Sequence, residues 1–566
     1  MSRRCRRMPT DQTELTMNGM KRIVFFFFLV AASLAGVAQI AGVKAPATVT
    51  LYGTAECEVM LTGTWTNPYL QEEAALDMMV TAPSGRRLTV PCFYMSGESG
   101  KASLWGARFT PQERGLYHYH FRYTERGRVA DESEEAVLTV GKAARSAHGM
   151  LHANDNWTFR YDDGTLFRGV GENICWESRT SDDSKYFRQL HEQRERFSYD
   201  AMLPKFARNG GNFVRMWMCS WNFPIDRQCD FNNFRYAETD EYMNPSAIER
   251  LDRTLALAEQ LGLKVMLCMG PGDVQTNREF FVTSQAKARY KNRLRYIVAR
   301  WGYSTSIGAW EFFNEIDNIQ FRDARNPLPA QDIVAWHTEM AHYLKGLDPF
   351  GHIVTTSISH RDIEGLNSIA DIDLNQKHIY NNTSVIPSTI TSYEEKFGKP
   401  YVIGEFGREW DWSKNFDDIA DEMDADFRRG LWYGLFSPTP VTPMSWWWEY
   451  FDNRKLVPYF RAVRMVSELM LRESGGRFLQ VEAQADGAEA YALRCGRKVY
   501  VYVYNPSPET VRSVRVAFPR KKGTVEALSF ERLTFRKCGT AVPADDGFAT
   551  LPCEVPHLGE ALFVIR

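Results

Sequence analysis

The feature that most constrains the fold is a regular alternation of short apolar runs with amphipathic helical segments across residues 148–473. The apolar runs are nearly continuous, as in parallel strands that are buried on both faces. We count eight strand–helix rounds, which predict an α/β fold of the (β/α)8 TIM barrel type. The expected strands are 167–175, 212–218, 263–269, 307–315, 352–358, 374–380, 401–406 and 443–449. The expected helices are 199–208, 245–261, 288–301, 330–347, 363–369, 386–397, 421–436 and 457–471.

The segments on either side of this barrel have a different pattern. Residues 46–141 contain short alternating runs separated by turn signals, which is the strand spacing of an immunoglobulin-like β-sandwich. The run 115–121 places aromatic side chains on one face of an expected strand, and His118 and His120 on the other. Residues 475–566 return to short strands and predict a second, C-terminal β-sandwich.

The beginning of the chain reads as a targeting signal. Lys21 and Arg22 precede an apolar run over 23–34, and small residues follow up to Ala38. This order predicts a signal peptide over 1–38 that is removed from the mature protein. The apolar run is short for a transmembrane helix. We therefore expect a protein that is secreted or held in the periplasm of a bacterial envelope, without stable membrane insertion after cleavage.

Two alternatives stay open at this end of the chain. Translation could start at Met17 or Met20, because the residues before them are polar and basic. The apolar run could also stay uncleaved as an anchor. No Cys lies at the cleavage point, which argues against a lipid-anchored protein.

Composition narrows the classes of partner and cofactor. The net charge of −2 argues against a nucleic-acid or anionic-membrane partner. The ten Cys are irregularly spaced and include no Cys-x-x-Cys pair, so they indicate neither a zinc site nor a dense disulfide framework. We expect mostly buried free thiols, with a Cys219–Cys229 disulfide as the alternative. The oligomeric state stays open.

Polar side chains lie at the carboxyl ends of several expected strands. In a barrel of this kind, the functional groups come from those ends. Polar groups at the ends of buried strands need partners or water, so we expect these side chains to meet in one solvated pocket. The candidates are Arg215, Asn314, Glu315, His378, Tyr380, Glu405 and a Trp from the run Trp446-Trp447-Trp448.

Two of these candidates are carboxylates on strands three rounds apart, so they can face each other across the barrel mouth. Retaining glycoside hydrolysis needs one carboxyl group that donates a proton and another that is ionised and attacks the anomeric carbon. We assign Glu405 as the nucleophile, held ionised by Arg215 and hydrogen-bonded by Tyr380. Glu315 is the acid/base, and Asn314 is placed to bond a sugar hydroxyl. A carboxyl separation of roughly 5 Å is expected, whereas roughly 9 Å would indicate inversion.

Other polar residues near these strand ends have less specific interpretations. His378 is expected to contact the substrate or the acid/base residue. Glu311 lies deeper on the same expected strand and is expected to be a buried, partnered structural carboxylate. Asp317 is expected in a loop or cap. For Glu172 and Asn173, at the end of the first strand, substrate contact and a structural role are both open.

These motifs together resemble those of glycoside hydrolase clan A, especially family 5, the cellulase and mannanase family. The matching segments are Asn212-Phe213-Val214-Arg215, Trp310-Glu311 with Asn314-Glu315, His378-Ile379-Tyr380, Val402-Ile403-Gly404-Glu405-Phe406-Gly407, and Trp448 or a neighbouring Trp. The resemblance covers the barrel and implies a TIM barrel, retention of configuration, no metal and no cofactor. It also implies a central sugar subsite with Trp448 as its floor. The two flanking sandwiches resemble those around barrels in bacterial polysaccharide-degrading proteins.

One part of the family pattern is missing. Family 5 enzymes usually carry a further His on the strand-three side, where this chain has Cys268-Met269-Gly270-Pro271-Gly272. His360, after the fifth strand, is a poor substitute by position. The identity of the substrate therefore does not transfer from family 5.

The sequence thus predicts a retaining glycoside hydrolase that cleaves β-glycosidic bonds in a poly- or oligosaccharide by double displacement. A non-catalytic carbohydrate-binding protein on a barrel scaffold is one alternative. A transglycosylase with the same two carboxylates is another. The sugar, its linkage and the choice between endo and exo action stay open.

Overall fold

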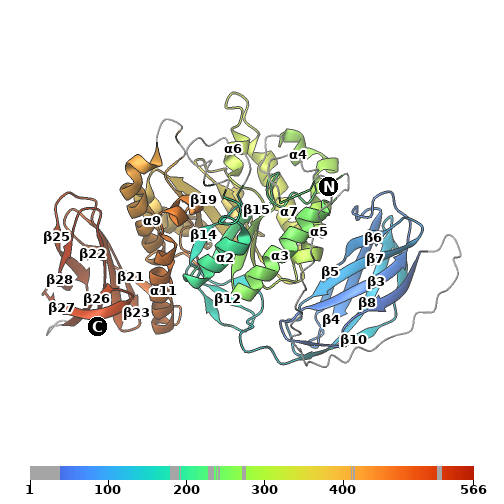
Figure 1. The fold of residues 1–566 in the computed structure, drawn as a ribbon, viewed down its shortest axis with the longest axis horizontal. Coiled ribbons are helices and arrows are strands. Elements are labelled where there is room, and N and C mark those ends of the chain that lie inside the picture. Colours follow the sequence, from blue (N-terminus) through green and yellow to red (C-terminus); the bar gives the residue numbers. More distant parts are fainter. Residues whose placement is uncertain are drawn as a thin grey trace, which may run out of the picture. The chain divides into compact units, whose positions relative to one another are not determined.

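The middle part of the chain forms a parallel sheet of seven strands in the computed structural model (Figure 1). Each strand pairs with the next one along the chain. Nearly all of their residues are buried, which explains the continuous apolar runs in the sequence. The strands are β14 (Gly171–Asn173), β15 (Phe213–Trp217), β16 (Lys264–Cys268), β17 (Ile307–Glu311), β18 (Ile353–Ile358), β19 (Leu374–Tyr380) and β20 (Tyr401–Gly407).

The structure describes residues 38–178, 190, 193–226, 235–237, 239, 243–270, 276–409, 411, 415–518 and 525–566. The predicted signal peptide, apart from Ala38, lies outside these residues, and so does Cys229 of the alternative disulfide. The side chains of Cys57, Cys92, Cys175, Cys268 and Cys495 are buried thiols. No helix among the described residues combines the length and the apolar character needed to cross a membrane.

A short segment joins the first and last strands of the central sheet. Single parallel bridges pair Gly169 with Val441 and Phe406 with Ser445. The sheet is thereby a nearly closed barrel, and residues 441–445 occupy the position of the expected eighth strand.

The expected strand over 443–449 is wrong beyond Ser445. Helix α10 (Trp448–Asn453) begins where that strand was expected to continue. The rings of Trp446 and Trp448 both pack edge-on with Trp176, at centroid distances of 5.4 and 5.0 Å. The helix that begins at Trp448, and not the pairing of these two rings, ends the extended segment.

Helices follow the strands along the chain, and local capping signals set several of their ends. The Asn244 side chain caps α3 by accepting hydrogen bonds from the Ser246 and Ala247 N–H groups. Gly262 ends the same helix with a φ of 68°, a conformation that favours glycine. The helices are α2 (Tyr199–Arg208), α3 (Pro245–Leu261), α4 (Arg278–Val282), α5 (Ser284–Trp301), α6 (Ile316–Gln320), α7 (Ala330–Leu347), α8 (Ile386–Phe397), α9 (Ala420–Leu435) and α11 (Phe460–Ser474).

Short 3-10 turns complete the helical content of the described residues. They are η1 (Leu366–Ser368), η2 (Thr383–Val385), η3 (Phe416–Ile419) and η4 (Val457–Tyr459). The helix expected over 363–369 is therefore wrong in type, because Gly365 adopts a φ of 89° that no α-helix accommodates. The helices expected over 199–208, 245–261, 330–347 and 386–397 are confirmed.

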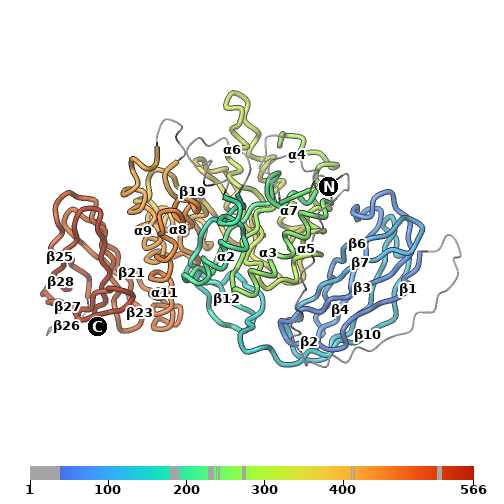
Figure 2. Tube along the Cα trace, in the orientation of Figure 1, coloured from blue at the N-terminus to red at the C-terminus, as the bar shows by residue number. Residues whose placement is uncertain are grey.

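The N-terminal residues form two largely antiparallel sheets, with strand orders β1-β3-β7-β6 and β2-β10-β8-β4-β5 (Figure 2). The aromatic side chains of β8 are buried, and His118 and His120 alternate with them, as the sequence predicted. The strands are β1 (Gln39–Lys44), β2 (Thr48–Thr50), β3 (Ala55–Thr62), β4 (Ala74–Thr81), β5 (Arg87–Pro91), β6 (Phe93–Gly97), β7 (Ala102–Phe109), β8 (Gly115–Glu125), β9 (Arg128–Glu132) and β10 (Ala136–Gly141).

A small antiparallel sheet that the sequence did not reveal packs on the amino-terminal ends of the barrel strands. It consists of β11 (Leu151–Ala153), β12 (Phe159–Tyr161) and β13 (Leu166–Phe167). Its apolar side chains share a buried cluster with residues that begin barrel strands, such as Phe213 and Leu374. This cluster fills the end of the barrel opposite the glutamate-bearing strand ends.

The C-terminal residues form a nine-stranded sheet system around a Val-rich core. Its strands are β21 (Phe478–Val481), β22 (Ala483–Gln484), β23 (Glu489–Cys495), β24 (Lys498–Tyr504), β25 (Val511–Ala517), β26 (Val525–Glu531), β27 (Thr534–Pro543), β28 (Phe548–Val555) and β29 (Glu560–Ile565). The fold is thus mixed α/β, with a nearly closed parallel barrel and further β-sheet regions.

Helix α9 lies very close to the segment that closes the barrel. A Cβ atom added at Gly434 would lie 1.9 Å from the Pro443 Cδ atom, well inside van der Waals contact. Gly346, on the exposed side of α7, has no atom within 4 Å of such a Cβ. The two helical glycines therefore differ in packing and not in secondary structure.

We predict opposite effects of the same substitution at these two glycines. Gly434→Ala should lower the free energy of unfolding by about 1–3 kcal/mol, because the added methyl group overpacks the contact with Pro443. Gly346→Ala should raise it by about 0.5–1 kcal/mol through helix propensity. Urea denaturation followed by tryptophan fluorescence measures both. Equal stabilisation by the two variants would contradict the close approach of α9 to the closing segment.

Candidate active site

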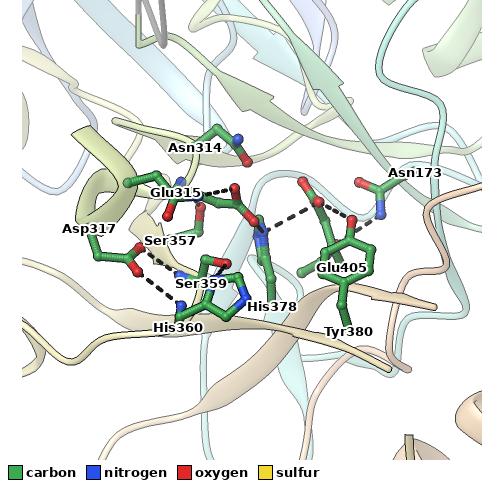
Figure 3. A network of polar contacts seen from close by, with 12 residues as sticks. Asn173, Asn314, Glu315, Asp317, Ser357, Ser359, His360, His378, Tyr380 and Glu405 are labelled. Atoms are coloured by element: carbon green, nitrogen blue, oxygen red, sulfur yellow. Dashed lines mark hydrogen bonds and ion pairs between the residues drawn. The ribbon is translucent and has the colours of Figure 1, made fainter. Parts of the chain in front are cut away.

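Glu315 and Glu405 meet beside His378 at the carboxyl end of the barrel (Figure 3). The His378 Nδ1 atom lies 2.8 Å from Glu315 Oε1 and 3.4 Å from Glu405 Oε2. One potential ligand atom from each of the three residues lies within 4.8 Å of those from the other two. The same nitrogen of His378 therefore lies close to an oxygen of each carboxylate.

Arg215, from β15, is fully buried and joins several of these groups. Its Nε and Nη2 atoms donate to the two oxygens of Glu311 at 2.7 and 2.8 Å. Its Nη1 atom donates to Glu405 Oε1 at 2.6 Å, and Nη2 also donates to Asn314 Oδ1 at 2.8 Å. Glu311 is thus a buried, partnered carboxylate, as the sequence predicted. One guanidinium fixes two carboxylates and an amide in a single arrangement.

Tyr380 supplies the second donor to Glu405. Its Oη atom donates to Glu405 Oε2 at 2.5 Å. Burial and the nearby Glu405 charge raise the pKa of the Tyr380 phenol well above its ordinary value, so it stays protonated. Both oxygens of Glu405 therefore accept hydrogen bonds that favour its ionised form.

The two carboxyl groups have different electrostatic surroundings. Burial raises the pKa of the Glu405 carboxyl, and the positive charges of His378 and Arg215 offset this only in part, so its pKa lies above the ordinary value. Burial also raises the pKa of Glu315, but the hydrogen bond and charge of His378 outweigh it, so this pKa lies below the ordinary value. The Glu315 side chain is 18% exposed and that of Glu405 only 3%.

Glu315 follows β17 and does not belong to it, although the sequence predicted a strand through residue 315. The strand ends at Glu311, and Glu315 takes a left-handed conformation with a φ of 49° before α6. Its N–H donates to Ser357 Oγ at 2.9 Å, and Asn318 Nδ2 donates to its Oε2 at 2.8 Å. A left-handed conformation is uncommon for a non-glycine residue and is held here by these contacts.

Glu172 and Asn173 hold the closing segment in place. The Asn173 amide donates to the carbonyls of Gly404 and Ser445 at 2.9 and 3.0 Å. Glu172 Oε1 accepts a hydrogen bond of 2.5 Å from Ser445 Oγ, and burial raises the Glu172 pKa well above its ordinary value. The sequence left both substrate contact and a structural role open for these two residues. Their contacts indicate the structural role.

The Trp run is divided between the surface and the core. Trp448 is 5% exposed and packs under Trp446, so it has no free face for a sugar. Trp446 is half-buried, and its ring centroid lies 5.4 Å from that of Trp217, whose ring in turn lies over Arg215. Trp448 therefore offers no ring face for the subsite floor that the resemblance implied at Trp448 or a neighbouring Trp.

Among the described residues, one group places three side chains close enough to hold a metal ion. Its members are Glu315, His378 and Glu405. Each of them already contacts another member of the group, and the Arg215 cation adjoins Glu405. A neighbouring cation disfavours a metal ion at this position. The absence of a metal stays a prediction.

A family model described as a domain of unknown function, DUF5060, matches residues 48–124, within the N-terminal β-sheet region. In sequence, the chain is 23% identical over 273 residues to mannan endo-1,4-beta-mannosidase A of Podospora anserina, covering 41% of this chain and 71% of that protein. It is 25% identical over 205 residues to mannan endo-1,4-beta-mannosidase A of Aspergillus aculeatus, covering 28% of this chain and 51% of that protein.

A crystal structure of a provisionally assigned glycoside hydrolase from Bacteroides vulgatus ATCC 8482 has the same fold. It matches with a TM-score of 0.63 at 13% identity and covers 92% of this chain and 100% of its own. At this identity the likeness concerns the fold alone. The chain is thus similar in sequence to mannanases at low identity, and in fold to the provisionally assigned glycoside hydrolase.

We predict that the Arg215–Glu311 pair is essential for the stability of the barrel. Glu311→Ala should lower the free energy of unfolding by about 3–5 kcal/mol, because it leaves a buried guanidinium without its bidentate partner. The matched control is Glu339→Ala, which removes a carboxylate paired with Lys287 and Lys291 at the surface and should change stability by less than about 1 kcal/mol. Denaturant midpoints measure both, and similar losses in the two variants would contradict this prediction.

Proposed function

We propose that this protein is a retaining β-glycosidase built on a (β/α)8 barrel whose eighth strand position is filled by residues 441–445. The observation that carries the proposal is the placement of two carboxylates within 4.8 Å of each other through His378. Retaining enzymes place their two carboxyl groups about 5 Å apart, whereas inverting enzymes leave room for a water molecule. We also propose that residues 46–141 form an immunoglobulin-like β-sandwich and that residues 475–566 form a second β-sandwich.

Glu405 suits the role of nucleophile. Arg215 donates to one of its oxygens and Tyr380 to the other. These two hydrogen bonds orient the carboxylate and stabilise its ionised form. In the proposed first step a Glu405 oxygen attacks the anomeric carbon and the glycosidic oxygen leaves. The product of that step is a covalent glycosyl-enzyme.

Glu315 suits the role of acid/base because it lies at the more accessible side of the pair. The Glu315 side chain is 18% exposed, and substrate binding would exclude water from its carboxyl and raise its pKa towards the protonated form that the first step needs. Once Glu405 is esterified, its negative charge is gone and the Glu315 pKa falls. Glu315 can then accept the proton of the water that releases the sugar.

The surrounding residues supply contacts for the sugar itself. The Asn314 amide is fixed by Arg215 and leaves its NH2 group for a hydroxyl of the sugar. Trp446 and Trp217 form an aromatic floor beside Arg215, which suits the apolar face of a sugar ring. Because the two sequence relatives described above act on mannan, β-1,4-mannan is the first polysaccharide to test. We also propose export through the signal peptide over residues 1–38.

We predict that azide separates the roles of the two glutamates. Glu405→Ala should abolish hydrolysis of β-1,4-mannan, and azide should then give an α-glycosyl azide from an activated aryl β-mannobioside. Glu315→Ala should give the β-glycosyl azide, because the intact nucleophile first forms the glycosyl-enzyme. The configuration of each product is read by proton NMR. The surface variant Glu339→Ala is the control and should keep the wild-type rate.

Failure of Glu405→Ala to lose activity would contradict the assignment. Binding of mannan without any product from the wild-type protein would favour the non-catalytic alternative. Longer oligosaccharides formed at high acceptor concentration would favour the transglycosylase.

We predict that replacing His378 shifts the pH profile upward. Its hydrogen bond and charge hold the Glu315 pKa below the ordinary value, and its charge also lowers the Glu405 pKa. His378→Gln should therefore raise both pKa values and move both limbs of the kcat/KM profile to higher pH. His342→Gln, at an imidazole that is 85% exposed on α7, is the control and should leave the profile in place. A downward shift in His378→Gln would refute this account.

A further inference from the structure

The two oxygens of the Glu315 carboxyl are held from different sides. Oε1 lies 2.8 Å from the His378 Nδ1 atom, which is itself 3.4 Å from Glu405 Oε2 (Figure 3). Oε2 accepts a hydrogen bond of 2.8 Å from the Asn318 Nδ2 atom. The His378 side chain has no exposed surface, whereas Asn318 is exposed. One oxygen of Glu315 is therefore bonded on the side of Glu405, and the other on the side of the solvent.

Asn318 is bound to Glu315 through its backbone as well. Glu315 immediately precedes α6, and Asn318 lies three residues later in the first turn of that helix. The Asn318 N–H donates to the Glu315 carbonyl at 2.9 Å. Residues three apart in a helical turn are neighbours on its surface, so the short Asn318 side chain reaches the carboxylate. Two hydrogen bonds thus join the same pair of residues.

Helix α6 is short, but its first turn is anchored to the segment that follows β18. Asp317 is fully buried, and its carboxylate caps that segment. Its oxygens accept hydrogen bonds of 2.7, 2.9 and 3.0 Å from three consecutive backbone N–H groups, those of Ser359, His360 and Arg361. Ser357, at the end of β18, accepts from the Glu315 N–H at 2.9 Å. Asn318 therefore donates to Glu315 from a turn whose backbone is fixed.

The hydrogen bond from Asn318 bears on proton transfer. An amide nitrogen only donates, so Asn318 stabilises the ionised form of Glu315 and fixes the direction of its Oε2 atom. A carboxylate oxygen can accept two hydrogen bonds, so Oε2 keeps a second position for a proton. The two carboxyl groups of a retaining enzyme flank the bond that is cleaved. The departing sugar therefore belongs on the side of Glu315 that faces away from Glu405, where Asn318 lies.

We propose that Asn318 is a positioning residue for the acid/base carboxyl, and that it holds Glu315 Oε2 as the oxygen that gives its proton to the departing sugar. The role in proton transfer rests on the proposed function. The effect of Asn318 on the Glu315 carboxylate does not, and it is measured in the protein without a substrate.

The titratable and charged groups around Glu315 come from several elements, and none of them is changed in a variant of Asn318. They are His378 on β19, Arg215 on β15, Glu405 on β20, Asp317 on α6 and His360 in the turn after β18. Asn318 itself carries no charge, so its effect on Glu315 comes from its hydrogen bond.

Asn156 offers a matched control for Asn318. Its Nδ2 atom also donates to the carboxylate of a glutamate, Glu394 of α8. Asn156 lies between β11 and β12, in the sheet that packs on the amino-terminal ends of the barrel strands. The substitution Asn156→Asp therefore places a new charge beside a carboxylate at the opposite end of the barrel from Glu315.

The first test titrates the carboxyl 13C resonance of Glu315 in protein labelled at glutamate, identified by its absence in Glu315→Gln. Asn318→Ala should raise the Glu315 pKa by about half a unit, because the ionised form loses an exposed donor. Asn318→Asp should raise it by about one unit, because a like charge replaces that donor. Asn156→Asp should leave it unchanged.

A wild-type Glu315 pKa in either Asn318 variant, or an equal rise in Asn156→Asp, overturns the proposal. Because Asn318 is exposed and Asp317 anchors the turn, both Asn318 variants should fold like the wild-type protein. Far-UV circular dichroism checks this.

The second test uses aryl β-mannobiosides with leaving groups of different acidity. Asn318→Ala should lower kcat/KM for the phenyl glycoside by about 10-fold, because that leaving group needs a well-placed proton donor. The dinitrophenyl glycoside needs no proton and should be cleaved at nearly the wild-type rate. Equal losses on both substrates would show a merely structural role and overturn the proposal. If the wild-type protein cleaves neither glycoside, the proposed function fails, while the titration still decides whether Asn318 acts on Glu315.

Discussion

The buried ion-pair network of Arg215 is the interaction on which the rest of the site depends. Placing a guanidinium and two carboxylates inside a barrel is unfavourable unless every charge is paired and every N–H is used. Arg215 meets this condition by a bidentate pair with Glu311, one bond to Glu405 and one each to the Asn314 and Asn173 side chains. Removing any member would leave an uncompensated charge, so the network fixes the geometry of β15, β17 and β20 relative to one another. Glu405 is therefore held in place before any substrate arrives.

The second carboxylate is held by quite different means. Glu315 is not among the groups to which Arg215 donates, and it lies in a turn with a left-handed backbone. Contacts with Ser357 at the end of β18 and with His378 fix it instead. The pair thus combines one rigid, ion-paired carboxylate with one that is more exposed and held by neutral donors and an imidazole. This asymmetry suits two carboxyl groups that must differ in protonation during one reaction cycle.

Much of this arrangement could be predicted from local sequence, and the exceptions share a physical reason. Strands such as Leu374–Tyr380 were predictable because their apolar period and their ends are encoded locally. The closing segment was predicted too long, because α10 begins at Trp448. The packing of Trp448 with Trp176 joins residues more than two hundred positions apart. The hydrogen bonds between Asp317 and the turn at Ser359 also join distant parts of the chain. No periodicity in the sequence predicts a carboxylate that caps a distant loop. The motifs predict which groups react, but the contacts that orient these groups join residues that are far apart in the sequence.

The most direct measurement of the central claim is covalent trapping with a 2-fluoro-β-mannosyl fluoride, followed by peptide mass spectrometry. A nucleophile held as an anion by Arg215 and Tyr380 should attack the anomeric carbon, and the fluorine should slow release of the sugar. The account predicts one added sugar on the peptide that carries Glu405, with no label in Glu405→Ala. Labelling of Glu315, or turnover of β-mannan without any trapped intermediate, would contradict it.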